Sequence, residues 1–190
     1  IKGTSEDGTT ITTRNIFVNV LQTYEVSVQV SGDSSKKGDP GDELVFEITV
    51  KNKGNGEDTV SLSLEGAKSS WGSIVDEVEL VSGETKTVNL TVNIDDDATV
   101  GDNDIVVNGT SEDNPSAYDT GTVKVSVNKQ FKVDVVVSSK SGDPGSTVAY
   151  DVRIQNEGTG NDTFTVNIDD YPAGWSVDPV SFQVEDIPAG

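Results

Sequence analysis

The sequence contains no cysteine, no histidine and no methionine in its 190 residues. Without cysteine the chain has no disulfide, no thiolate nucleophile and no cysteine metal cage. Without histidine it has no Ser-His-Asp or Cys-His catalytic arrangement and no histidine metal site. Carboxylate pairs remain, but a glycosidase-type pair needs a shaped cleft, and the sequence shows no long insertion that would build one. We therefore expect no enzyme activity.

Basic side chains are scarce: 13 Lys and Arg stand against 33 Asp and Glu, which gives a formal net charge of −20. Nucleic acids and anionic membranes are bound through clustered Lys and Arg, so this charge argues against both as partners. No apolar run is long enough to span a membrane, and no signal peptide is recognisable. The acidity fits either a solvated surface that keeps a repetitive β protein soluble or an adaptation to saline water or divalent cations.

Amphipathic helical stretches are missing too, and hydrophobic residues make up only 33% of the chain. In residues 45–50 every second residue is apolar, a pattern that predicts a strand with one buried face. The alternation resumes at Val60 and Leu62, after Gly54 and Gly56, which fit a turn that needs positive φ. The sequence therefore predicts an all-β chain with a half-buried β-hairpin over residues 45–62.

The same pattern returns later in the chain, with a period near 104 residues. Matching positions include Asn52 and Asn156, Trp71 and Trp175, each pair 104 residues apart, and residues 3–7 with residues 109–113. A period this long indicates whole domains in series, because solenoid repeats are much shorter. We interpret the chain as part of a longer tandem array.

Three parts follow from this period. Residues 1–22 are expected to be the C-terminal strands of a preceding repeat, including a strand over 16–20. Residues 23–128 are expected to form one complete domain, and residues 129–190 the N-terminal part of a further repeat. Seven predicted strands in the complete domain are typical of an immunoglobulin-like sandwich. The predicted fold is therefore tandem seven-stranded Ig-like β-sandwiches arranged head to tail, and the three-residue junctions predict a stiff rod.

Short motifs in residues 24–128 resemble a known pattern, and parts of it recur in both flanking segments. The motifs are Pro40-Gly41-Asp42, Asn52-Lys53-Gly54, Trp71, residues 82–88 (SGETKTV) and residues 97–102 (DATVGD). The pattern resembles the Ig-like domains associated with NPCBM modules in α-galactosidases, the adhesion-related CARDB domains and the repeats of archaeal surface proteins. Asn103 departs from it, because the family usually has an aromatic residue there. The resemblance implies an Ig-like fold that serves as spacer, adhesive stalk or enzyme appendage, and it brings no catalytic residues.

One loop is crowded with aspartates. They are Asp95, Asp96, Asp97, Asp102 and Asp104. Calcium prefers several oxygen ligands at flexible spacing, so these residues are the candidate metal ligands, with calcium as the candidate cofactor. No EF-hand pattern is present, and the family pattern that the sequence resembles already accounts for Asp97 to Gly101 as a turn.

Three asparagines lie in glycosylation sequons: Asn89, Asn108 and Asn161. Alternation places Asn89 and Asn108 on the outer face of their strands, and Asn161 lies in a turn, so all three are candidate glycan acceptors. Chance occurrence in an Asn- and Thr-rich chain is the alternative.

Trp71 and Trp175 recur in register beside alternating apolar positions. An exposed ring would stack on a sugar face, whereas a buried ring would fill a sandwich core, and the apolar neighbours favour the core.

The function expected from these patterns is structural. We expect a non-catalytic, extracellular series of domains in an archaeal or bacterial surface filament, S-layer or stalk, with copies of itself or neighbouring repeats as partners. The alternative is a carbohydrate-binding or adhesive accessory module of a secreted enzyme.

Overall fold

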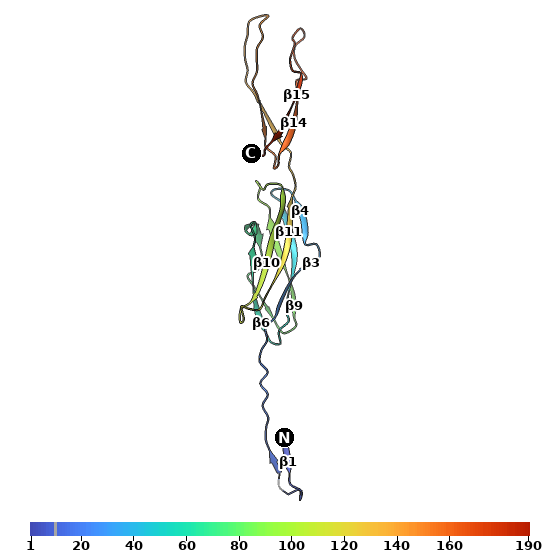
Figure 1. The fold of residues 1–190 in the computed structure, drawn as a ribbon, viewed down its shortest axis with the longest axis vertical. Helices are drawn as coiled ribbons and strands as arrows, with labels where there is room; N and C mark the ends of the chain where they lie inside the picture. Colours follow the sequence, from blue (N-terminus) through green and yellow to red (C-terminus); the bar gives the residue numbers. More distant parts are fainter. Residues whose placement is uncertain (10) are drawn as a thin grey trace.

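The structure is a computed structural model that describes residues 1–9 and 11–190, and it is elongated (Figure 1). A short N-terminal hairpin and an extended stem lead into a central sandwich, and two further strand pairs follow at the opposite end. The strands before the sandwich are β1 (Lys2–Thr4) and β2 (Ile11–Thr13). The strands after it are β12 (Val133–Val137), β13 (Val152–Asn156), β14 (Asp162–Asn167) and β15 (Ser181–Ile187).

The central sandwich spans residues 26–127 and is called the middle unit below. Its first sheet has the order β3 (Val26–Ser31), β5 (Glu43–Asn52), β9 (Thr85–Asn93), β7 (Gly72–Ser73). Its second sheet has the order β4 (Ser35–Gly38), β11 (Tyr118–Val127), β10 (Gly101–Ser111), β6 (Asp58–Glu65), β8 (Glu77–Leu80). The 3-10 helix η1 (Ser69–Trp71) is the only helical segment among residues 1–9 and 11–190. The all-β prediction is therefore confirmed.

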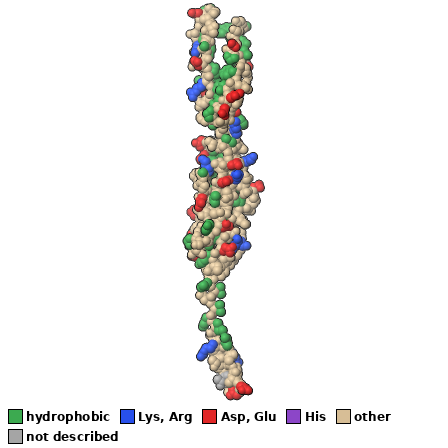
Figure 2. Space-filling model, in the orientation of Figure 1, with side chains coloured by type: hydrophobic (Ala, Val, Ile, Leu, Met, Phe, Trp, Pro, Cys, Tyr) green, Lys and Arg blue, Asp and Glu red, His purple; other side chains and the backbone are tan. Residues whose placement is uncertain are grey.

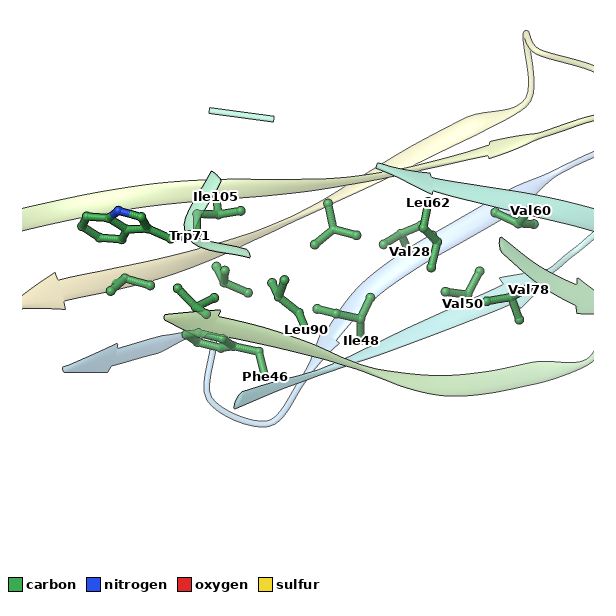
Figure 3. Close-up of a cluster of buried hydrophobic side chains, with 14 of the residues drawn as sticks. Val28, Phe46, Ile48, Val50, Val60, Leu62, Trp71, Val78, Leu90 and Ile105 are labelled. Atoms are coloured by element: carbon green, nitrogen blue, oxygen red, sulfur yellow. The ribbon is translucent and has the colours of Figure 1, made fainter. Parts of the chain in front are cut away.

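The core lies between the two sheets, as the alternation predicts. Phe46, Ile48 and Val50 on β5 are buried, while Glu47 and Lys51 on the same strand are exposed. Side chains from both sheets meet them in one layer, and Figure 3 shows Leu62 and Val60 across from Ile48 and Val50. Burying one apolar face of each sheet is the main source of stability in such a two-layer fold.

The predicted hairpin over residues 45–62 is wrong. β5 pairs with β3 and β9, whereas β6 pairs with β10 and β8, so the two strands lie in opposite sheets. Both edges of β5 are already occupied, so β6 cannot pair with it, and residues 53–57 cross from one sheet to the other. Alternation identifies the buried face of a strand but not its partner.

The strand count also differs from the expected seven, because the middle unit has four strands in one sheet and five in the other. The short strands β4 and β7 are the additions. β4 pairs in parallel with β11, and β7 has two residues paired with β9. Residues 69–80 contain three short elements, η1, β7 and β8. β10 begins at Gly101 and includes Asn103, so the unusual residue there does not prevent the strand.

Residues 129–190, called the open unit below, form two separate two-stranded sheets, β12–β13 and β14–β15. β12–β13 repeats the pairing of β3–β5, since Val133 lies opposite Asn156 as Val26 lies opposite Asn52. At the other end, β1 pairs with β2, but the strand expected over residues 16–20 is not formed, and those residues are exposed. A strand needs a neighbouring backbone to pair with, and no strand lies beside this stem among the described residues.

Candidate functional site: the junctions between units

The contacts that fix one unit to the next lie where a short linker meets a loop. The loop of residues 53–57 holds residues 21–25, and the loop of residues 157–161 holds residues 128–132. We call each of these loop and linker pairs a linker clamp. Two clamps about 104 residues apart allow the same contact to be compared twice within one chain.

In the first clamp, two loop residues bond three linker residues. Thr23 N donates to Asn55 Oδ1 at 2.8 Å, and Asn55 N donates back to Thr23 O at 3.3 Å. Lys53 N donates to Glu25 O at 2.7 Å, and Asn55 Nδ2 donates to Leu21 O at 3.0 Å. The linker is thus bonded along its whole length.

The second clamp repeats these bonds with different residues. Gln130 N donates to Thr159 Oγ1 at 2.8 Å, and Thr159 N donates to Gln130 O at 3.1 Å. Glu157 N donates to Lys132 O at 2.9 Å. Thr159 replaces Asn55 as the side-chain acceptor, so the geometry recurs although the residue type differs.

A buried asparagine shapes the loop of each clamp. Asn52 is only 1% exposed, its Oδ1 accepts from Gly54 N at 2.8 Å, and its Nδ2 donates to Gly56 O at 2.8 Å and Leu80 O at 3.1 Å. Leu80 lies in the opposite sheet, so this one amide joins the loop to both sheets. Asn156 makes the equivalent bonds to Gly158, Gly160 and Ile187.

Glycine is required at positions 54 and 158 because the linker leaves no room for a side chain there. A Cβ at Gly54 would collide with the carbonyl oxygen of Thr23, and a Cβ at Gly158 would collide with that of Gln130. The prediction that Gly54 and Gly56 supply positive φ is wrong, because neither is among the glycines with positive φ. Glycine here allows the linker backbone to approach the loop closely.

Each clamp also carries an ion pair, with the charges reversed between the two. Glu25 pairs with Lys53 at 3.7 Å, and Lys132 pairs with Glu157 at 2.6 Å. The hydrogen bond from Lys132 to Glu157 raises the pKa of Lys132 above its usual value. These pairs are largely solvent-exposed and contribute little to the free energy of unfolding. The reversed order of the two charges shows that the linker and the loop carry opposite charges at this position in both clamps.

The second linker is held by the middle unit as well. Asn128 N donates to Gly38 O at 2.9 Å, and Asn128 Nδ2 donates to Asp39 Oδ1 at 2.8 Å. Val100 N donates directly to Thr159 O at 3.3 Å, from the middle unit to the open unit. A cleft of about 510 Å³ beside these contacts is lined by Asp39, Pro40, Asp42, Asp96, Gln130, Phe131, Lys132, Glu157 and Thr159.

The five candidate calcium ligands are not brought together. Asp95 Oδ2 accepts from Trp71 Nε1 at 2.7 Å, Asp96 lines the junction cleft, and Asp97 is exposed. Asp102 and Asp104 lie on β10, and both form ion pairs with Lys124. A hydrogen bond from Ser126 and the neighbouring charge of Lys124 lower the pKa of Asp102. Within residues 1–9 and 11–190 no group of three or more acidic side chains is placed to hold a metal ion. The calcium site stays a prediction without a supporting geometry.

The three sequon asparagines differ in their accessibility. Asn89 is exposed on β9, and Asn108 is half-buried on β10 with its Nδ2 3.4 Å from Glu65 Oε1. Asn161 is exposed at the second clamp, where its Nδ2 donates to Asp186 Oδ1 at 2.9 Å and its carbonyl accepts from Lys129. Glycosylation of these residues stays a prediction, and Asn89 offers the clearest access.

The two tryptophans differ in burial. Trp71 is 3% exposed at one end of the core, beneath Lys68 Nζ at 4.7 Å from the ring centroid, so the core prediction is confirmed for Trp71 (Figure 3). Trp175 is 67% exposed, so the same prediction is wrong for Trp175. Within residues 129–190 no strand matches β9, β10 or β11, so in this part of the chain no opposite layer covers the ring.

Replacing Gln22 with lysine is expected to raise the free energy of unfolding of the middle unit by about 1 kcal/mol. Asp58 is buried, and its Oδ2 has no hydrogen-bond partner. At the second clamp the matching carboxylate, Asp162, pairs with Lys129 at 3.6 Å, and Gln22 occupies the position of Lys129. Lysine at position 22 would supply the missing cation.

The measurement for Gln22→Lys is urea unfolding, repeated in an Asp58→Asn background. A gain of equal size in that background would contradict the assigned ion pair.

Comparison with known proteins gives matches only at the level of structure. No family model matches the sequence, and no curated protein matches it. Similar solved structures include a family 123 glycoside hydrolase from Clostridium perfringens, with 11% identity over 56% of this chain and 27% of that chain, and a TM-score of 0.43. Another is the CARDB domain of a Pyrococcus furiosus protein in complex with di-metal ions, with 18% identity over 62% of this chain and 100% of that chain, and a TM-score of 0.39. A third is native alpha-2-macroglobulin from Escherichia coli, with 13% identity over 76% of this chain and 8% of that chain, and a TM-score of 0.40.

The CARDB domain belongs to one of the groups whose pattern the sequence resembles. The chain covers about a quarter of the hydrolase and less than a tenth of the macroglobulin, and identities this low concern the fold alone. Among the described residues, no helix has the length and apolar character needed to cross a membrane.

Proposed function

We propose that this chain is a non-catalytic, extracellular spacer of tandem Ig-like units, which holds successive units in a fixed line within a surface filament, layer or stalk. The observation that carries the proposal is the repeated linker clamp. A linker bonded along its length to the next unit has few free torsions, so it transmits orientation in a way that a flexible Gly/Ser tether does not.

Three further features support the same role. Val100 and Asn128 bond the middle unit to the second clamp and its linker, so two units share one junction. The net charge of −20 keeps an elongated β protein soluble. It also makes the surface charge negative, so that cations bridging two neighbouring copies would favour lateral packing. Asn89 and Asn108 lie on strand faces that a surface glycan could occupy.

Spin-label distance measurements test the proposal. Because the chain has no cysteine, the changes Thr87→Cys on the middle unit and Glu185→Cys on the open unit give two unique labels at exposed positions. We expect a single narrow distance distribution by pulsed electron resonance. Gly158→Val should broaden it, because the new side chain would push Gln130 away from the loop.

A matched control is Gly190→Val, at a glycine of the same unit that has open space around it and no positive φ. The label distance should stay narrow in this variant. A broad distribution in the unmodified pair of labels would show that the units pivot freely, and the spacer role would then have no basis.

The exposed Trp175 ring favours a second candidate, the carbohydrate-binding accessory module. Tyr171 lies nearby in sequence and is also exposed, and exposed aromatic faces stack on sugar rings. Saturable quenching or enhancement of Trp175 fluorescence by soluble polysaccharides, lost in Trp175→Ala, would favour this module over the spacer.

A further inference from the structure

The loop of the first clamp contains an Asn-Gly dipeptide, Asn55-Gly56. Asparagine is a chemically labile residue. A glycine after it leaves the next backbone nitrogen free to attack the asparagine amide, because glycine has no Cβ to hinder the approach. The second clamp has Thr159-Gly160 at the matching positions, and threonine has no amide to be attacked. The two clamps therefore share their geometry but differ in chemistry.

The linker controls the reactive amide through hydrogen bonds. Thr23 N donates to Asn55 Oδ1 at 2.8 Å, and Asn55 Nδ2 donates to Leu21 O at 3.0 Å, so both polar atoms of the side chain are held. Gly56 N, the attacking atom, donates no hydrogen bond to any residue in the described part of the chain. The closed clamp thus slows the attack by fixing the amide, and an open clamp permits it.

We propose that Asn55-Gly56 is a spontaneous deamidation site, and that its conversion opens the first clamp irreversibly. Gly56 N forms a bond to Asn55 Cγ while the Cγ–Nδ2 bond breaks. The proton of Gly56 N passes through solvent to the departing nitrogen, which leaves as ammonia. Water then adds to either carbonyl carbon of the cyclic imide and opens it to aspartate or isoaspartate. The net reaction exchanges the amide nitrogen for a water oxygen and needs no oxidant or reductant.

Either product weakens the clamp. The new carboxylate can still accept from Thr23 N, but it has no donor for Leu21 O and brings a negative charge close to that carbonyl. Isoaspartate also lengthens the backbone just before Gly56, whose carbonyl oxygen accepts from the buried Asn52 Nδ2 at 2.8 Å. The loop then no longer matches the linker, and hydrolysis is not reversed when the two meet again.

β10 contains the same dipeptide where the reaction is blocked. Asn108 and Gly109 lie in the ladder between two strands, with Gly109 opposite Asp119 of β11 and Leu62 of β6. Pairing on both sides keeps this backbone extended, and forming the cyclic imide would require the central strand to open first. Asn108 is therefore an internal reference for an Asn-Gly that the fold protects.

A complete preceding unit leaves the clamp loop open to water. The second clamp follows the complete middle unit, and Thr159 and Gly160 remain partly exposed there. On the face drawn in Figure 2 the molecule is narrower at this junction than across the middle unit. Asn55 and Gly56 occupy the same positions in the first clamp, so water reaches them when another unit precedes.

Peptide mapping by mass spectrometry of the 190-residue chain, aged in mildly alkaline buffer, tests the site. We expect Asn55 to deamidate at least about tenfold faster than Asn108. Gly54→Val should accelerate the reaction at Asn55 at least about threefold, because its side chain would collide with Thr23 O and open the clamp. Asn108 should stay slow in this variant, which shows that the sheet is intact.

The control for Gly54→Val is Gly190→Val, at a glycine with open space and no positive φ, and it should leave the rate at Asn55 unchanged. Equal rates at Asn55 and Asn108 in the parent chain would overturn the inference. A rate at Asn55 that Gly54→Val does not change would overturn the control by the clamp.

Hydrogen exchange of residues 21–25 tests the opening. These amides should exchange faster in the aged chain than in the fresh one. Asn55→Thr, which introduces the residue of the second clamp, should age without this change. An aged, deamidated chain with unchanged exchange in the linker would overturn the opening.

The effect of deamidation on the line of units rests on the spacer function proposed above, whereas the chemistry at Asn55 does not. The labels at positions 87 and 185 span the second clamp, which has no Asn-Gly. A broad label distance would therefore remove the spacer function without changing the rates at Asn55, and a stable Asn55 would leave the label distance narrow.

Discussion

Replacing Asn52 with alanine is expected to lower the free energy of unfolding of the middle unit by about 3 kcal/mol. The substitution removes three hydrogen bonds and leaves Gly54 N, Gly56 O and Leu80 O without their partner. Gly54 and Leu80 are buried, and a buried polar group without a partner costs about 1–3 kcal/mol. The loop of the first clamp would lose its anchor to both sheets at once.

Urea unfolding monitored by the fluorescence of the buried Trp71 measures this effect, because Trp175 is already exposed and contributes a constant background. Asn89→Ala is the matched control, since Asn89 is exposed on β9, and its change should stay within about 0.5 kcal/mol. Asn156→Ala should weaken the second clamp in the same way and broaden the spin-label distances between the two units. Equal effects of Asn52→Ala and Asn89→Ala would remove the special role of the buried amide.

The fold class follows from the sequence because alternation is a local signal. Residues 46, 48 and 50 indicate their buried face without any knowledge of the partner strand, and the structure confirms that face. The choice of partner is not local: whether β6 lies beside β5 or across from it depends on β3 and β9 occupying both edges of β5. The hairpin prediction failed for this reason.

The clamps could be predicted only in part. The recurrence of Asn52 as Asn156, together with the glycines two residues after each, signals a shared backbone arrangement. The sequence does not indicate that the asparagine bonds across the sandwich or that the glycines face a linker carbonyl, because both contacts join residues from distant elements. The reversed ion pairs, Glu25 with Lys53 and Lys132 with Glu157, were visible in principle as a covariation between the two repeats.

Trp71→Ala is expected to lower the free energy of unfolding of the middle unit by about 4 kcal/mol, the largest single effect we foresee. The indole is 3% exposed, and its removal leaves a cavity at one end of the core. It also takes away the hydrogen bond from Nε1 to Asp95 Oδ2. Trp71→Phe keeps most of the apolar volume and loses the hydrogen bond, so it should cost less, about 1–2 kcal/mol.

Trp175→Ala is the matched control that the repeat itself provides. The same residue type at the same repeat position is 67% exposed, so its removal should change the stability of the open unit by less than about 0.5 kcal/mol. Urea unfolding monitored by far-ultraviolet circular dichroism measures both variants without relying on either indole. The two variants distinguish the effect of the local backbone from the effect of ring packing. If a tryptophan at this position stabilised the fold through its local backbone, both substitutions would lower the free energy of unfolding by the same amount. A large difference assigns the effect to the opposite layer of the sandwich, which surrounds Trp71 and is missing around Trp175.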